Sequence, residues 1–163
     1  MQIAVLTAHH FITGDAQVHE QRLSDFLGNI LATTLKLSGT TTARLTAPTE
    51  VLARHAEANI PASEIIAAFE QGGSAASRSG AIVPKHPHSV SLIAGPVEIH
   101  GRIHALGERQ LDIREMFTTL ADRFVPVTQA EVRLVATSQR LSLPAVMVNV
   151  RRITYMARSE DAT

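Results

Sequence analysis

The two halves of this chain carry the same pattern at a spacing of 87 positions. Gly14 and Gly101 are separated by this distance, and so are the apolar stretches IAVLT and VSLIA that precede them. Near the ends of the halves, Ile66 and Ile153 return to the same spacing. An ordered series of matches favours a tandem duplication. The alternative is that two generic β-α-β units resemble each other, because few binary patterns exist.

Each half also contains one amphipathic helix pattern followed by a strand pattern. The helical segments are 23–31 and 113–121, and the strand segments after them are 40–47 and 129–136. Their apolar positions recur at the i, i+3, i+4, i+7 and i+8 spacing of a helix with one buried face. These positions are Leu23, Phe26, Leu27, Ile30 and Leu31 in the first half, and Ile113, Met116, Phe117, Leu120 and Ala121 in the second. Residues 49–58 have a helix-forming composition where the second half offers a strand or a turn, so their structure is left open.

Residues 97–105 alternate between apolar and polar side chains, which predicts a half-buried strand. Ile99 and Ile103 share the apolar face, whereas His100 and His104 share the polar face. The glycine at the same place in both halves indicates a bulge or a close approach of the backbone. In the last strand, the alternation skips a residue at two arginines, which predicts a second bulge.

These patterns predict an α+β, β-rich fold of two similar β-β-α-β-β units packed as a pseudo-symmetric pair. Unit 1 would span residues 1–71, and a Gly/Ser/Pro linker would span 72–88. Unit 2 would span 89–163 and end in a short polar tail. Hydrophobic residues make up 45% of the 163 residues but aromatic residues only 4%, so the core must be mainly aliphatic.

Short motifs in both halves add a family resemblance. The first half contains HFITGDAQ and RLSDFLGN, and the second contains VEIHGRIH, FVPVTQAEVRL and VNVRRITYM. These stretches resemble a bacterial domain family of unknown function, whose members read as I-x-G, R-L-S-D-x-L-N, F-x-x-L-T-x-A-x-V and a final V-N-x-x-x-I strand. The chain departs from that pattern at RQLDIREMF and LKLSGTTTA. Because the family has no established activity, the resemblance implies a fold unit, and it favours an adaptor or sensory module over an enzyme.

Charge and cysteine content exclude several classes of protein. Lys+Arg and Asp+Glu both number 15, whereas chains that grip phosphates are usually far more basic. An RNA-binding β-rich fold is therefore a disfavoured third hypothesis, and no nucleic-acid partner is expected. The absence of cysteine removes thiolate nucleophiles, disulfides and Cys-ligated zinc. With neither a basic leader nor an apolar stretch of about 20 residues, we expect a cytoplasmic protein without a membrane partner.

Histidines give the candidate metal site. His86 and His88 form an H-x-H pair, whose rings point to one side of an extended chain. His100 or His104 could supply a third ligand for a divalent metal. The latter two cannot readily share an ion with each other, because four strand residues span about 13 Å. A solvated strand face is the competing explanation for them.

The remaining candidates are arginines. Arg102, Arg151 and Arg152 could bind an anion or a partner, although Arg151 and Arg152 would serve equally well beside a bulge on an edge strand. The sequence has no P-loop, no G-x-G-x-x-G and no G-x-S-x-G elbow, and no residue is assigned a catalytic role.

The favoured hypothesis is a non-catalytic binding, adaptor or sensory module that acts through a protein partner, through homo-oligomerisation or through a small ligand. Exposed strand edges provide a physical route to self-association. No resident cofactor is expected under this hypothesis. The alternative is a His-dependent metal-binding protein or metalloenzyme that uses the linker H-x-H.

Overall fold

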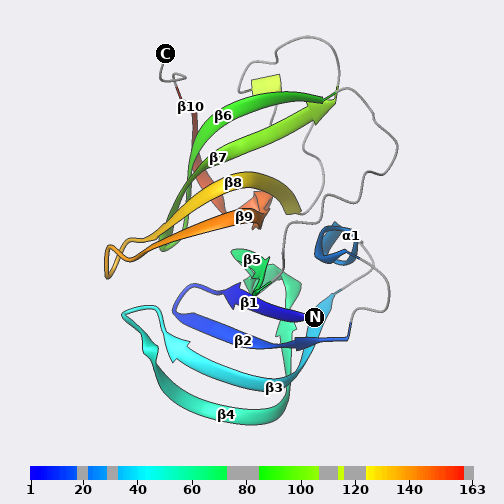
Figure 1. Cartoon of the computed structure of the whole chain (residues 1–163), viewed down its shortest axis with the longest axis vertical. Coiled ribbons are helices and arrows are strands. Elements are labelled where there is room, and N and C mark those ends of the chain that lie inside the picture. Colours follow the sequence, from blue (N-terminus) through cyan, green and yellow to red (C-terminus); the bar gives the residue numbers. More distant parts are fainter. Residues whose placement is uncertain (18–21, 29–32, 73–84, 107–113, 116–123, 160–163) are drawn as a thin grey trace.

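The computed structural model describes residues 1–17, 22–28, 33–72, 85–106, 114–115 and 124–159, without the side chains of 85, 86, 105 and 106. The described residues form mostly strands (Figure 1). In chain order the elements are β1 (Gln2–Leu6), β2 (His10–Ala16), α1 (Leu23–Gly28), β3 (Thr34–Arg44), β4 (Ala47–Pro61), the 3-10 turn η1 (Ala62–Glu64), β5 (Ala67–Glu70), β6 (Lys85–Ala94), β7 (Val97–Leu106), β8 (Phe124–Leu134), β9 (Arg140–Asn149), the 3-10 turn η2 (Val150–Arg152) and β10 (Ile153–Arg158).

All of these strands belong to one ten-stranded antiparallel sheet with the order β10-β6-β7-β8-β9-β5-β1-β2-β3-β4. The two halves of the chain have the same internal strand order. The order β5-β1-β2-β3-β4 in the first half corresponds strand for strand to β10-β6-β7-β8-β9 in the second. Figure 1 shows the first half as the lower lobe and the second as the upper lobe. β5 and β9 join the lobes, so β4 and β10 are the outer strands of the sheet.

The predicted α+β class is wrong, because the chain folds as a mostly-β antiparallel sheet instead of two β-β-α-β-β units. Two segments account for the extra strands. Residues 49–58 lie within strand β4, which pairs with β3 through a ladder whose register shifts on both sides of Val51. This pairing overrides the helix-forming composition of the segment. In the second half, the predicted bulge at Arg151–Arg152 is the turn η2, which divides one expected strand into β9 and β10.

The first helix pattern contains helix α1, which is described over Leu23–Gly28. Of the second pattern only Arg114 and Glu115 are described, and both are helical. Residues 29–32 and most of the expected second helix, 113–121, lie outside the described part of the chain. α1 buries Leu23 and Leu27 and contacts β8 and β9 of the other half. Among the described residues, the structure has no helix that is long and apolar enough to cross a membrane.

The predicted irregularity at the repeated glycines is confirmed in both halves. The β2·β3 register shifts beside Gly14, and the β7·β8 register shifts beside Gly101. The opposing strand has a left-handed residue at the shift, Gly39 with φ 56° and Gln129 with φ 49°. A Cβ on Gly101 would lie 2.5 Å from the Val127 Cγ1 atom. The glycines are therefore needed because the bulged strand approaches their backbone closely.

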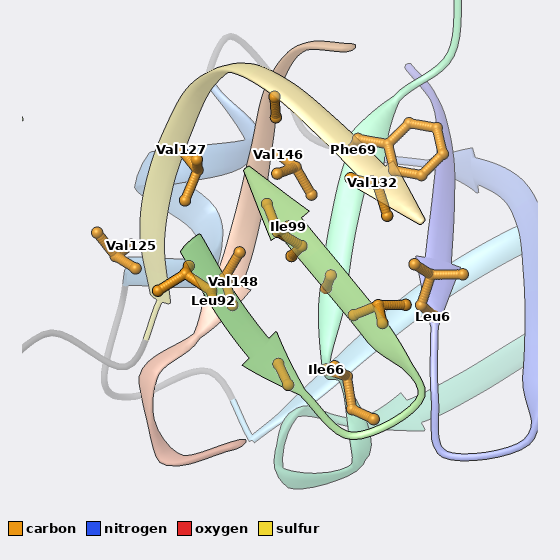
Figure 2. Close-up of a cluster of buried hydrophobic side chains, with 14 of the residues drawn as sticks. Leu6, Ile66, Phe69, Leu92, Ile99, Val125, Val127, Val132, Val146 and Val148 are labelled. Atoms are coloured by element: carbon orange, nitrogen blue, oxygen red, sulfur yellow. The ribbon is translucent and has the colours of Figure 1, made fainter. Parts of the chain in front are cut away.

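Two apolar clusters lie on opposite faces of the sheet. Figure 2 shows the larger cluster, which fills the concave face of the second half with aliphatic side chains such as Ile99, Val127 and Val148. Leu6 and Phe69 from the first half also enter this cluster. The smaller cluster includes residues of β1, β3 and α1 from the first half, together with Phe124 and Met147 from the second half. Each half therefore contributes side chains to the core of the other.

The halves are also connected by the segment between β5 and β6. Residues 73–84 of the expected linker lie outside the described residues. β6 begins at Lys85, so residues 85–88 are already part of a strand.

Candidate interaction surface

The two outer strands expose apolar side chains. β4 and β10 each have one edge without a neighbouring strand in the part of the chain that the structure describes. On β4, Val51 and Leu52 are each 48% exposed. On β10, Tyr155 is 53% exposed and lies opposite Ile93 of β6, which is 37% exposed. Both ends of the sheet therefore combine an open backbone edge with large exposed apolar side chains.

The junction between the halves shows how such an edge is covered within this molecule. β5 pairs with β9 through only two residue pairs, Ala67 with Val148 and Ala68 with Met147. Both faces of this short ladder are buried, because Ala67 and Val148 belong to the larger cluster while Ala68 and Met147 belong to the smaller one. Burial of apolar surface on both sides compensates for the small number of backbone hydrogen bonds.

Asn149, the last residue of β9, stabilises this junction. Its backbone N–H donates to the Ile66 carbonyl at 2.9 Å, and its side-chain Nδ2 donates to the Ile65 carbonyl at 2.9 Å. Its Oδ1 accepts a hydrogen bond from the Arg151 backbone N–H at 3.1 Å. The side chain is only 2% exposed, and hydrogen bonds at both ends of the amide compensate for its burial.

Two of the predicted arginines lie together beside the junction. Arg151 and Arg152 line a groove of about 450 Å³, which also borders Ile66 and Gly95. The Arg152 Nε donates to the Ser63 carbonyl at 3.0 Å. This arginine is therefore already engaged by the first half of the chain.

Arg152 also forms an ion pair with Glu64. Its guanidinium lies 3.6 Å from the Glu64 Oε1, and both side chains are partly exposed, so the ion pair contributes little on its own. Arg102 lies elsewhere, exposed on β7 where it pairs with Ser89 and Thr128. The structure thus brings two of the three candidate arginines together, and an anion-binding role for them stays a prediction.

The histidines of β7 lie on the polar face of that strand, as its alternation predicts. The His100 Nδ1 is 2.8 Å from the Ser91 Oγ, and the His104 Nε2 is 2.8 Å from the Thr128 Oγ1. Each ring is therefore hydrogen-bonded to a hydroxyl group on a neighbouring strand. These contacts are ordinary cross-strand pairs.

His88 lies on the opposite face of the same sheet. It pairs with Ile103 in the β6·β7 ladder and is 2% exposed, so its side chain faces the core. The side chain of His86 is outside the described residues. The structure does not bring His88 together with His100 or His104, and no group of three His, Cys, Asp or Glu residues in the described ranges could hold a metal ion. The H-x-H metal site stays a prediction without support from these contacts.

Sequence reasoning missed the two features that define this surface. The composition of residues 49–58 is compatible with a helix or a strand, although two prolines, Pro48 and Pro61, lie near the ends of β4 as in many edge strands. The candidate residues chosen from the sequence also do not include Asn149. The sequence signal for Asn149 is a single amide inside the apolar run VMVNV. Such an amide is informative because a polar residue in a buried strand needs a specific partner.

Comparisons with protein-family models, curated proteins and solved structures found no match to this chain.

Proposed function

We propose that this protein is a non-catalytic interaction module that binds another polypeptide by adding a strand to its open sheet edges. The observation that carries the proposal is the position of its exposed apolar side chains. Val51 and Leu52 lie on one outer strand, and Tyr155 lies on the other. An open edge supplies backbone hydrogen bonds, and neighbouring side chains supply specificity.

The composition supports a protein partner over a polyanion. The formal net charge is zero and aromatic residues are scarce, whereas surfaces that bind nucleic acid combine basic and stacking side chains. We keep a cytoplasmic location and the absence of nucleic-acid and membrane partners as predictions from the sequence. The resemblance to a bacterial domain family also remains a prediction.

We also propose that the two halves arose by duplication. Support comes from their shared strand order and from the bulge that each half places beside its repeated glycine. The relation matters for function because each strand then has a counterpart in the other half. The strand that pairs with an element in one half therefore indicates which kind of strand could pair with the equivalent element of the other half.

A peptide selection tests the interaction proposal. Random peptides of about nine residues, the length of a long strand, are displayed on phage and selected on the purified protein. We expect bound peptides to slow amide hydrogen exchange along β4 or β10. Leu52→Lys should weaken the β4 binders roughly tenfold, and Tyr155→Lys should do the same for the β10 binders.

Val135→Lys is the matched control, because Val135 is 52% exposed but follows β8 in the turn towards β9, away from both open edges. This variant should bind the selected peptides unchanged. Peptides that protect neither outer strand, or that bind all three variants equally, would overturn the proposal.

A further inference from the structure

The pairing registers of the two halves define which residues are equivalent in β4 and β9. Asp15 and Arg102, which follow the repeated glycines, pair with Ser38 and Thr128. Leu35 and Val125 lie three residues before these partners and are therefore equivalent. Leu35 pairs with Ile60 in the first half, and Val125 pairs with Val148 in the second. The pairs before and after these keep the same correspondence, so Asn59 matches Met147. β4 is therefore the counterpart of β9, with Ile60 in the place of Val148.

The same comparison defines the equivalence of β5 and β10. Val5 pairs with Ala68 in the first half, and Leu92 pairs with Met156 in the second. Both strands follow a 3-10 turn of three residues. Tyr155 therefore occupies the place of Ala67, and Met156 the place of Ala68.

These equivalences expose an asymmetry in how the strands are used. β9 and β5 pair with each other and join the halves, whereas their counterparts β4 and β10 are the outer strands. We propose, building on strand addition as the function, that the partner is a second copy of this chain. β10 of one copy pairs with β4 of the next, with Tyr155 opposite Ile60 and Met156 opposite Asn59.

The side chains along this register are compatible with pairing. Continuing the antiparallel register places Ala157 opposite Ala58, two small residues that are both half-buried. It then places Arg158 opposite Glu57, a carboxylate that already lies 2.9 Å from the Lys36 Nζ on β3. Opposite charges at directly facing positions favour an antiparallel pair. The contact would also cover part of the exposed Tyr155 side chain.

One residue makes the contact between copies weaker than the internal junction. Pro61 occupies the place of Asn149, with φ −56° and ψ 131° against φ −70° and ψ 111°. The backbone conformation is the same, but proline has neither the N–H nor the side-chain amide that Asn149 donates to Ile66 and Ile65. Pairing between copies therefore lacks two hydrogen bonds, which makes it reversible.

The arrangement is head-to-tail, because the two surfaces in contact are different. Each copy that joins through its β10 leaves its own β4 open, and the reverse holds at the other end. Such heterologous contacts build a ring when the rotation between copies closes and an open chain of copies when it does not.

Cysteine cross-linking tests the register directly, because the natural chain contains no cysteine. Ala58→Cys and Ala157→Cys proteins are purified separately, checked for native circular dichroism, mixed and oxidised. Facing positions of an antiparallel pair fall within disulfide range. The mixture should form disulfide-linked dimers, whereas neither variant alone should do so.

Ala53→Cys replaces Ala58→Cys in the matched control. Ala53 is also half-buried on β4, but it lies five residues away, or about 17 Å along the strand. Its mixture with Ala157→Cys should give at least about tenfold fewer dimers, because strand spacing places the sulfurs out of reach. Equal yields in the two mixtures, or no dimer in either, would overturn self-pairing. Selected peptides that still protect β4 or β10 would then leave strand addition standing, whereas their failure as well would remove both proposals.

Discussion

Asn149 and Pro61 hold equivalent places at the ends of β9 and β4, and their different chemistry separates a permanent junction from an open edge. Asn149 donates two hydrogen bonds to the first half of the chain, whereas Pro61 ends the outer strand β4. The backbone follows the same path in both places. Two units with the same strand order therefore differ in the hydrogen bonds that this one position can donate.

The apolar cores of the two halves differ as well. Ile99 is completely buried in the second half, whereas its counterpart Ile12 is only half-buried. Ala130 and Val132 of β8 are buried in the larger cluster, whereas Thr40 and Thr42 take their places on β3. The second half thus carries the more apolar core.

The largest expected effect on the free energy of unfolding comes from substitutions in the two cores. Ile99→Ala should lower the free energy of unfolding by about 2–5 kcal/mol, because it leaves a cavity among fully buried side chains. Ile12→Ala should lower it by about 1–2 kcal/mol, since less apolar surface is lost at a half-buried site. Urea denaturation measures both. Equal losses would contradict the difference between the two cores.

The repeated glycines give the next comparison. Gly101→Ala should lower the free energy of unfolding by about 2–3 kcal/mol, because overpacking forces the neighbouring strand to move. Its Cβ would lie 2.5 Å from the Val127 Cγ1 and 2.9 Å from the Thr128 carbonyl oxygen. Gly14→Ala should lower it by about 1 kcal/mol, because its nearest contact, the Thr40 Cγ2, is 3.0 Å away. Guanidinium denaturation gives the order, and a larger loss at Gly14 would contradict the bulge geometry.

The junction residue gives a third comparison. Asn149→Ala should lower the free energy of unfolding by about 1–3 kcal/mol, because it leaves the buried Ile65 carbonyl without its donor. Pro61→Ala, at the equivalent place on the open edge, should change it by less than about 0.5 kcal/mol. Thermal and urea denaturation of the two variants measure this difference. A loss at Pro61 as large as that at Asn149 would show that the edge is already sealed within one copy.

The parts of the fold that the sequence predicted are those that local pattern determines. The alternation in 97–105 places His100 and His104 on the polar face, and the repeated glycines mark the bulges in both halves. Strand β4 was harder to predict, because the composition of residues 49–58 favours a helix and pairing with β3 makes them a strand. The match of Ile66 with Ile153 was one residue out of place, since the registers and the two 3-10 turns equate Ile65 with Ile153.

The candidate site was harder to predict because it depends on contacts between the halves. The histidines drew attention as chemical groups, but strand facing separates His88 from His100. Asn149 gave only a weak signal, and its role appears once β9 is placed beside β5. Long-range pairing of this kind is not encoded in any single segment.

The replacement Pro61→Asn tests the account most directly, because it gives the open edge the residue that seals the internal junction. Sedimentation equilibrium of the natural protein and this variant should give an average mass above the 17.6 kDa of one chain that rises with concentration. The variant should associate roughly tenfold more tightly, since one or two recovered hydrogen bonds contribute about 1–2 kcal/mol. Two proteins that both stay at the mass of one chain, or an identical association constant for the two, would contradict the account.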